Sequence, residues 1–263
     1  MNFHKLGQVT PQSGETADTI AATELLQEQN VPVLGIVNVV GSSLARQVDG
    51  GIYLHAGPEI AVASTKAFTN MVVLLALRLA KAMDADKDTR EEIISALKKL
   101  PKQLEEVLKL HPKIKARAKT WAKYDNAMFL GRDNLYAFAL EGALKLKETT
   151  YIHAEGLAAG EMKHGPIALI DKDFLVVYLH GRGELAAKSR SNLEEVKARK
   201  GKTVVISDDT RFKEADFSLP NSSYWTQGLL MNIVMQLMSY EIAKVKGTNV
   251  DKPRNLAKSV TVE

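Results

Sequence analysis

Two kinds of apolar pattern run along this chain and predict its secondary structure. Continuous apolar runs bounded by turn residues indicate strands buried on both faces, as in a parallel sheet. Such runs lie at 31–39, 52–57, 126–132, 174–181, 202–208 and 215–220. Apolar residues at helical spacing predict helices between them. These helices span 16–29, 62–83, 88–108, 112–123, 184–200 and 223–246.

Two local features qualify this pattern. Pro101 lies inside the predicted helix 88–108 and predicts a break there, because proline removes a backbone donor. After the strand at 126–132, a helix carries Glu141 to Glu148, and a second helical stretch is expected to end at His164.

The order of the elements repeats, which indicates two copies of one α/β unit. Each copy has a turn, a helix, a strand, a short strand and a long helix, and the spacing from Gly14 to Ile36 equals that from Gly183 to Val205. The predicted fold class is α/β, with two parallel sheets flanked by helices in three layers, of the flavodoxin-like kind. Residues 1–9 supply no full strand, so we expect the first copy to be incomplete and to lack roughly 50 residues that the second copy has.

Composition restricts the class of protein. With 263 residues and 45% hydrophobic content, the chain can bury a substantial core. No apolar run is long enough to span a bilayer, so a cytoplasmic location is expected. The absence of cysteine excludes disulfides and thiolate chemistry, and the net charge of +4 is spread out rather than gathered for nucleic acid. Neither a metal nor an organic cofactor is implied, since no His/Asp/Glu group has ligand spacing.

The turn at 10–16 is a candidate anion site. Gln12, Ser13 and Thr16 surround Gly14 just before a predicted helix, and a helix N-terminus offers unpaired N–H groups to a phosphate. Ser64 lies near the start of a later helix and offers a similar hydroxyl. An ordinary capped turn would use the same residue types, so both interpretations stay open.

The stretch from Leu140 to Ala168 carries most of the candidate acid–base chemistry. At 100° per residue, Glu141, Lys145 and Glu148 lie on one stripe of a helix. Two carboxylates sharing one ammonium can tune which group holds a proton, although an i,i+4 surface pair has the same spacing. Two histidines follow, His153 and His164; by sequence alone either can be a structural residue.

Long segments of the chain resemble the isomerase half of the glucosamine-6-phosphate synthase family (glutamine:fructose-6-phosphate aminotransferase), which consists of two sugar isomerase (SIS) domains. The segments are QSGETADT, VVGSSLAR, HAGPEIAVASTKAFT, ALEGALKLKE, YIHAEGLAAGEMKHGPIALID and PRNLAKSVTVE. The resemblance implies a first SIS domain at 1–110, a helical linker at 111–123, a second SIS domain at 124–246 and an active-site tail at 247–263.

The resemblance also implies a role for each candidate residue. Glu148 matches the base that moves a proton between C1 and C2 of the sugar, with Lys145 assisting. His164 matches the residue that opens the sugar ring, contributed by the neighbouring subunit of a homodimer. Lys258 matches a lysine that forms a Schiff base with the open-chain ketose. The residues expected to bind the phosphate or line the sugar are Gln12, Ser13, Thr16, Ser64, Val62, Ala257 and Arg254.

The chain departs from the family pattern at three places. Pro11 stands where the family has a serine, and we expect this chain to lack both the family's first Gly-Thr-Ser phosphate segment and its glutaminase domain. HGRGEL, at the corresponding turn of the second copy, lacks the Ser-rich pattern, so one sugar site per chain is expected.

We therefore expect binding of fructose 6-phosphate or glucosamine 6-phosphate and ketose–aldose isomerisation without glutamine hydrolysis. The alternatives are a stand-alone phosphosugar isomerase or deglycase, and a non-catalytic phosphosugar-binding or dimerisation module.

Overall fold

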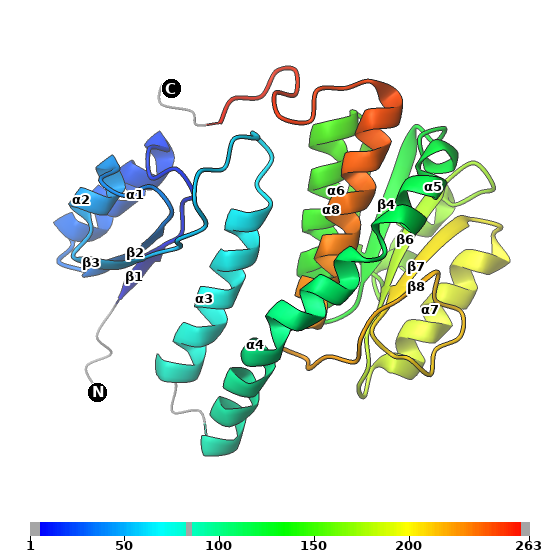
Figure 1. Ribbon diagram of the computed structural model, residues 1–263, viewed down its shortest axis with the longest axis horizontal. Coiled ribbons are helices and arrows are strands. Elements are labelled where there is room, and N and C mark those ends of the chain that lie inside the picture. The colour runs from blue at the N-terminus through cyan, green and yellow to red at the C-terminus, as the bar shows by residue number, and fades with distance from the viewer. Residues whose placement is uncertain (1–5, 83–85, 259–263) are drawn as a thin grey trace. The chain divides into compact units, whose positions relative to one another are not determined.

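The computed structural model describes residues 6–82 and 86–258 of the chain (Figure 1). These residues form two compact units. The first unit contains the residues up to 81 together with those from 251 onward, and the second unit contains 82–250. The last residue of the predicted helix 62–83 lies outside the described residues. The domain limits expected from the sequence stay a prediction.

The first unit has a parallel sheet in the order β1-β2-β3, formed by Gly7–Val9, Val33–Val37 and Gly50–Tyr53. Figure 1 shows α1 (Ala17–Glu28) and α2 (Ser43–Gln47) on one side of this sheet and α3 (Lys66–Ala82) on the other. The α3 side buries Ile36, Leu54 and Ala67 together.

The strand β1 corrects one expectation, because residues 7–9 do form a strand. It pairs in parallel with β2, from Gly7 opposite Val33 to Val9 opposite Gly35. A side chain at Gly7 would begin 2.8 Å from Leu26 Cδ1, so glycine permits the close approach of α1 to this strand.

The second unit has a five-stranded parallel sheet in the order β5-β4-β6-β7-β8. In chain order the strands are β4 (Asn126–Gly131), β5 (His153–Ala158), β6 (Leu175–His180), β7 (Lys202–Ser207) and β8 (Phe217–Ser218). All six residues of β6 are buried, which agrees with a central strand covered on both faces. The order 2-1-3-4-5 is flavodoxin-like, and the neighbours β6-β7-β8 repeat the arrangement β1-β2-β3 of the first unit.

Helices cover both faces of this second sheet, giving the three predicted layers. Figure 1 shows α6 (Leu135–Thr150) and α8 (Gln227–Lys246) on one face and α7 (Ala186–Ala198) on the other. The α7 face buries Tyr178 and Leu193 with their neighbours. On the opposite face, Gly142 lets α6 approach closely, since a Cβ there would lie 2.3 Å from Met235 Sδ. The helices α4 (Lys87–Leu108) and α5 (His111–Trp121) precede the sheet.

Two sequence-based expectations in this unit are wrong. The second helical stretch expected after residue 150 begins instead as β5, because α6 ends at the left-handed Tyr151 and the chain then pairs with β4. Gly156 helps this pairing: a side chain there would collide with α6 at Leu140, 2.5 Å away. Helix α4 is not broken at Pro101, whose position is exposed; buried residues on both sides, Ile93 and Val107, hold the helix against the unit.

Among the described residues, none of the helices has the length and apolar character that crossing a membrane requires.

Candidate functional site

A buried cluster of charges lies on α6. Lys145 Nζ is 2.8 Å from Glu148 Oε2 and 3.5 Å from Glu141 Oε1. The side chains are only 4% exposed at Lys145, 11% at Glu141 and 20% at Glu148. The structure therefore confirms that the three residues share a stripe, and it excludes a solvated surface pair. A lysine and two glutamates packed together in a nearly buried site are an arrangement typical of functional sites.

Local sequence explains why α6 carries this cluster inward. Small or short side chains on the same helix, at Gly142, Ala143 and Thr149, let it pack closely and bury its polar stripe. The Thr149 hydroxyl donates to the carbonyl of Lys145 at 2.8 Å, so it makes no demand on the charged groups. The cluster is thus held on a rigid helix rather than a loop.

The candidate anion turn of the first unit leads into α1. Gly14 is left-handed at φ 71°, and a side chain there would collide with Ser42. Thr16 is the N-cap residue of α1 but makes no side-chain capping bond, whereas Ser13 Oγ accepts from the N–H of Glu15 at 3.2 Å. Gln12, Ser13 and Thr16 are all half-buried. The Thr16 hydroxyl at a helix N-terminus is the group in this turn best placed to meet an anion.

Glu59, which sequence reasoning did not single out, occupies the start of α3. Its Oε1 accepts from the backbone N–H groups of Thr65 at 2.8 Å and Ala67 at 3.2 Å, and its Oε2 accepts from the Ser64 hydroxyl at 3.0 Å. The helix therefore begins at Lys66 rather than at Val62 as expected, because this carboxylate caps it. Ser64 donates its only hydroxyl proton to Glu59, so it can donate to a phosphate oxygen only after releasing this carboxylate.

The tail returns to this same segment of the first unit. Lys258 Nζ donates to the carbonyl of Ala61 at 2.5 Å and to Glu59 Oε2 at 3.4 Å. The N–H of Val62 donates to the carbonyl of Asp251 at 2.9 Å. Two other tail residues expected near the sugar, Arg254 and Ala257, are exposed. The structure thus brings Lys258, Ser64 and Val62 into one neighbourhood within the first unit.

His164 lies at the end of a 3₁₀ turn, Met162–His164, and its side chain is 75% exposed. Its Nε2 is 3.9 Å from Glu161 Oε2, a pair that water screens. His153, at the start of β5, is also exposed and lies 3.5 Å from Glu155. The ion pairs of His153 and His164 are thus with Glu155 and Glu161 rather than with the α6 cluster.

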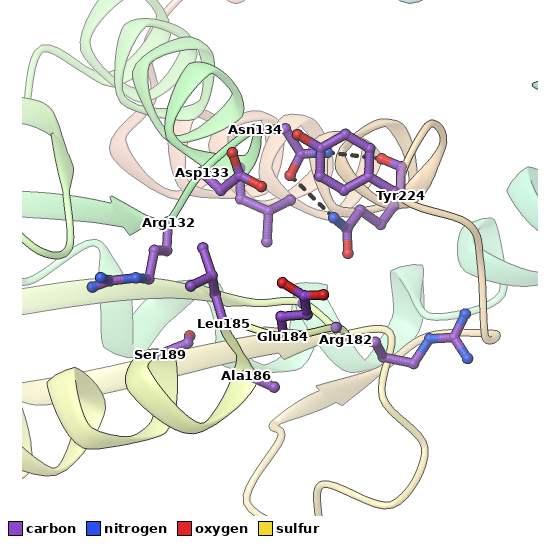
Figure 2. A pocket seen from close by; sticks show the side chains of 13 residues that line it. Arg132, Asp133, Asn134, Arg182, Glu184, Leu185, Ala186, Ser189 and Tyr224 are labelled. Carbon is purple, nitrogen blue, oxygen red and sulfur yellow. Dashed lines mark hydrogen bonds between the residues drawn. The ribbon is translucent and has the colours of Figure 1, made fainter. Parts of the chain in front are cut away.

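A cavity of about 350 Å³ lies in the second unit where β4 and β6 end and α6 and α7 begin (Figure 2). In Figure 2 the guanidinium groups of Arg132 and Arg182 extend away from this space, whereas the Glu184 carboxylate lies within it. Arg132 Nη1 donates a hydrogen bond to Asn192 Oδ1 at 3.0 Å, and Arg182 Nε lies 3.6 Å from Oδ2 of the buried Asp208. The cavity is therefore a poor phosphate cradle, although it stands at the switch point of the sheet.

Within residues 6–82 and 86–258, no group of three or more His, Cys, Asp and Glu residues could hold a metal ion. The signal that could have revealed Glu59 is its place just before a helix with free N–H groups, in the segment HAGPEIAVASTKAFT. Its contact with Lys258, far along the chain, has no local sequence signal.

The family model described as SIS domain matches residues 9–81 and 122–246. A glutamine–fructose-6-phosphate aminotransferase (isomerizing) of Bacteroides thetaiotaomicron is 47% identical over 262 residues, covering 96% of this chain and 42% of the relative. The protein of the same name from Escherichia coli K12 is 45% identical over 261 residues, covering 96% of this chain and 43% of its own length. The chain thus spans about two fifths of the curated relatives it matches.

Solved structures resemble the fold closely. The C-terminal domain of glucosamine-fructose-6-phosphate aminotransferase from Francisella tularensis superposes with a TM-score of 0.87 at 39% identity, covering 94% of this chain and 72% of that one. A glucosamine-6-phosphate deaminase from Thermotoga maritima superposes with a TM-score of 0.78 at 24% identity, covering 99% and 76%, a likeness that shows the fold alone.

Proposed function

Since the chain belongs to the SIS domain family and matches the isomerase portion of glutamine–fructose-6-phosphate aminotransferases, we propose that it binds fructose 6-phosphate or glucosamine 6-phosphate and interconverts ketose and aldose. The observation that carries the proposal is the nearly buried cluster of Glu141, Lys145 and Glu148 on α6. A proton transfer between adjacent sugar carbons needs one carboxylate in a site that excludes most water, and this cluster supplies it.

Glu148 is the proposed base. It takes a proton from C1 of the open-chain ketose and returns it to C2, while the hydroxyl proton of O1 passes to O2. The ketone at C2 thereby becomes an aldehyde at C1 through an enediol. Lys145, 2.8 Å from Glu148, supplies a positive charge that can stabilise the carboxylate or a developing enediolate oxygen. Glu141, on the other side of the ammonium, holds Lys145 in place.

The first unit is the proposed source of the phosphate site and of the amine. Gln12, Ser13 and Thr16 lie at the N-terminus of α1, where N–H groups and the helix dipole favour an anion. Lys258, the proposed Schiff-base lysine, contacts the segment that contains Val62 and Ser64. Ala257 and Arg254 lie close to Lys258 in sequence. A neutral amine attacks a ketone carbon, so Lys258 acts after losing a proton to solvent.

His164 is the proposed ring-opening residue, and its exposure supports a role in a partner's site rather than in its own chain. An imidazole titrates near neutral pH and can protonate a ring oxygen. This part of the proposal requires a homodimer. Ammonia supply forms no part of the proposed activity.

The decisive experiment is conversion of fructose 6-phosphate to glucose 6-phosphate by the purified chain. Glu148→Gln should lower the turnover rate about 10²- to 10⁴-fold, the usual contribution of a positioned base. Glu91→Gln, on an exposed surface pair, is the matched control and should leave turnover unchanged. A folded wild-type chain that binds glucosamine 6-phosphate without turnover would instead be a non-catalytic phosphosugar-binding module.

The same assay tests the shared site. Inactive Glu148→Gln and His164→Asn chains, mixed and allowed to exchange, should recover about a quarter of wild-type turnover, because half of the dimers then hold one intact site. No recovery from a mixture that does exchange subunits would place both residues in the same chain's site.

A further inference from the structure

The proposed Schiff-base lysine is held by a definite pair of acceptors. Lys258 Nζ lies 2.5 Å from the carbonyl oxygen of Ala61 and 3.4 Å from Glu59 Oε2. Its side chain is 29% exposed, whereas that of Glu59 is only 3% exposed. A lysine in an irregular tail has many rotamers, so two acceptors on one segment restrict where its nitrogen lies.

Glu59 is ionised in this environment. Burial raises the pKa of its carboxyl group, but the N–H groups of Thr65 and Ala67 and the Lys258 ammonium outweigh burial and leave the pKa below its usual value. The side chain therefore carries a full negative charge at neutral pH, facing an ammonium that can be reached from solvent.

The two carboxylate oxygens of Glu59 have different hydrogen-bond partners. Oε1 accepts from the N–H groups of Thr65 and Ala67 and so caps α3. Oε2 accepts from the Ser64 hydroxyl and from Lys258. One side chain thus links the start of the helix, a proposed phosphate-binding hydroxyl and the proposed reactive amine.

We propose that Glu59 is a positioning residue for Lys258, holding its nitrogen beside Ser64 so that it meets the carbonyl carbon of the bound ketose. This inference rests on the proposed function. After the ammonium gives one proton to solvent, Nζ bonds to C2 of the ketose, and the carbonyl oxygen leaves as water with the two hydrogens that remain on the nitrogen. An imine results. Glu59 touches neither sugar nor imine in this scheme and acts through the lysine.

Glu59→Gln separates positioning from capping. The amide oxygen can replace Oε1 and accept from Thr65 and Ala67, because only an acceptor satisfies those N–H groups. The NH₂ group then replaces Oε2 and faces Lys258, where a donor meets a donor. The variant keeps the cap of α3 and removes the charged acceptor of the amine, leaving the Ala61 carbonyl as its remaining acceptor.

The test is borohydride trapping with fructose 6-phosphate. Hydride adds to the imine carbon and water protonates the nitrogen, leaving a secondary amine that peptide mass spectrometry locates at Lys258. At saturating sugar, the trapping rate of Glu59→Gln should fall at least about tenfold, while the half-saturating sugar concentration stays within about twofold. Glu91→Gln serves again as the charge control. Equal trapping rates in Glu59→Gln and wild type would overturn the inference and leave the proposed function intact.

A second measurement needs no sugar. Trypsin must draw Lys258 out of its place to cut after it, so release of residues 259–263 should be at least about tenfold faster in Glu59→Gln than in wild type. Unchanged cleavage would contradict the anchor directly. A wild type that is never labelled at Lys258 would remove the Schiff-base role, and with it the positioning role, even where trypsin confirms the anchor.

Discussion

The two units place similar turns at the carboxyl ends of similar strands, but the turns carry opposite chemistry. After β1, the turn presents the Ser13 and Thr16 hydroxyls at the start of α1. After β6, the corresponding turn presents the Glu184 carboxylate, and Arg182 points away from it (Figure 2). Arg182 is paired with Asp208. A repeated backbone fixes where a ligand can lie, and the side chains decide whether an anion is accepted there.

The second unit instead concentrates its carboxylates on α6. The first unit offers hydroxyls, helix N–H groups and an amine, which are groups that bind phosphate and attack a carbonyl. The second unit offers partly buried carboxylates, the type of group that transfers protons. This division of chemistry between two copies of one fold can be tested by changing equivalent groups in each.

The largest expected effect is on the α6 cluster. Lys145→Met leaves Glu141 and Glu148 facing each other without their shared ammonium, and should cost about 3 kcal/mol, the low end for a broken buried ion pair because Glu148 is partly exposed. Both tryptophans, Trp121 and Trp225, lie in the second unit, so their fluorescence during urea unfolding reports this unit. Lys147→Met, exposed on the same helix, is the control and should change stability by less than about 0.5 kcal/mol.

The next effect concerns the two turns. Thr16→Val removes one donor at the start of α1 and should weaken glucosamine 6-phosphate binding by about 1.5–3 kcal/mol, measured by titration calorimetry. Glu184→Gln, in the equivalent turn of the second unit, should leave the affinity within about twofold. Equal losses from both changes would mean that the second turn also binds the sugar phosphate and that the comparison fails.

The smallest expected effect is a difference in how the contributions of Asp208 and Glu59 to stability change at acidic pH. Burial raises the pKa of Asp208, and the hydrogen bonds from Ser222 offset only part of this increase. The pKa of Glu59, in contrast, is lowered. A carboxyl group whose pKa is lowered on folding stabilises the folded state at pH above its unfolded pKa, and this contribution is lost as the pH falls through the folded pKa. A carboxyl group whose pKa is raised on folding destabilises the folded state at high pH, and this penalty is lost as the pH falls.

The stability advantage of wild type over Glu59→Gln should therefore shrink as the pH falls below 4.5, the ordinary pKa of a glutamate side chain. Hydrogen exchange in α3 measures this difference. Stability relative to Asp208→Asn should grow as pH falls toward 3.8, the ordinary pKa of an aspartate side chain, measured by tryptophan fluorescence. Parallel slopes for the two pairs would show that both carboxyls sit in equivalent surroundings.

Much of the fold was predictable because it depends on patterns in short stretches of sequence. The apolar runs at β2, β4, β6 and β7 are long enough to be recognised as buried parallel strands, and the spacing of Glu141, Lys145 and Glu148 places them on one face of α6. Strand β5 was not predictable, since HAEGLA has the composition of a helix and becomes a strand by pairing with β4.

The site was predictable to a smaller degree. Residue types and spacing pointed to Thr16, Ser64 and Glu148 as candidates, and only the family resemblance pointed to Lys258; their roles stay predictions. The burial of the α6 cluster and the anchoring of the tail depend on contacts between distant segments. Glu59 shows the limit: its cap of α3 has a local signal, whereas its bond to Lys258 has none.

The bond between Glu59 and Lys258 joins two parts of the first unit that the whole second unit separates in sequence. A ribosome delivers residue 258 only after it has made residues 82–250, so the second unit is complete in length before this bond can form. The proposed reactive amine therefore reaches its place only after the second unit has been synthesised, and a nascent chain that lacks it holds the proposed sugar-binding turn without the lysine.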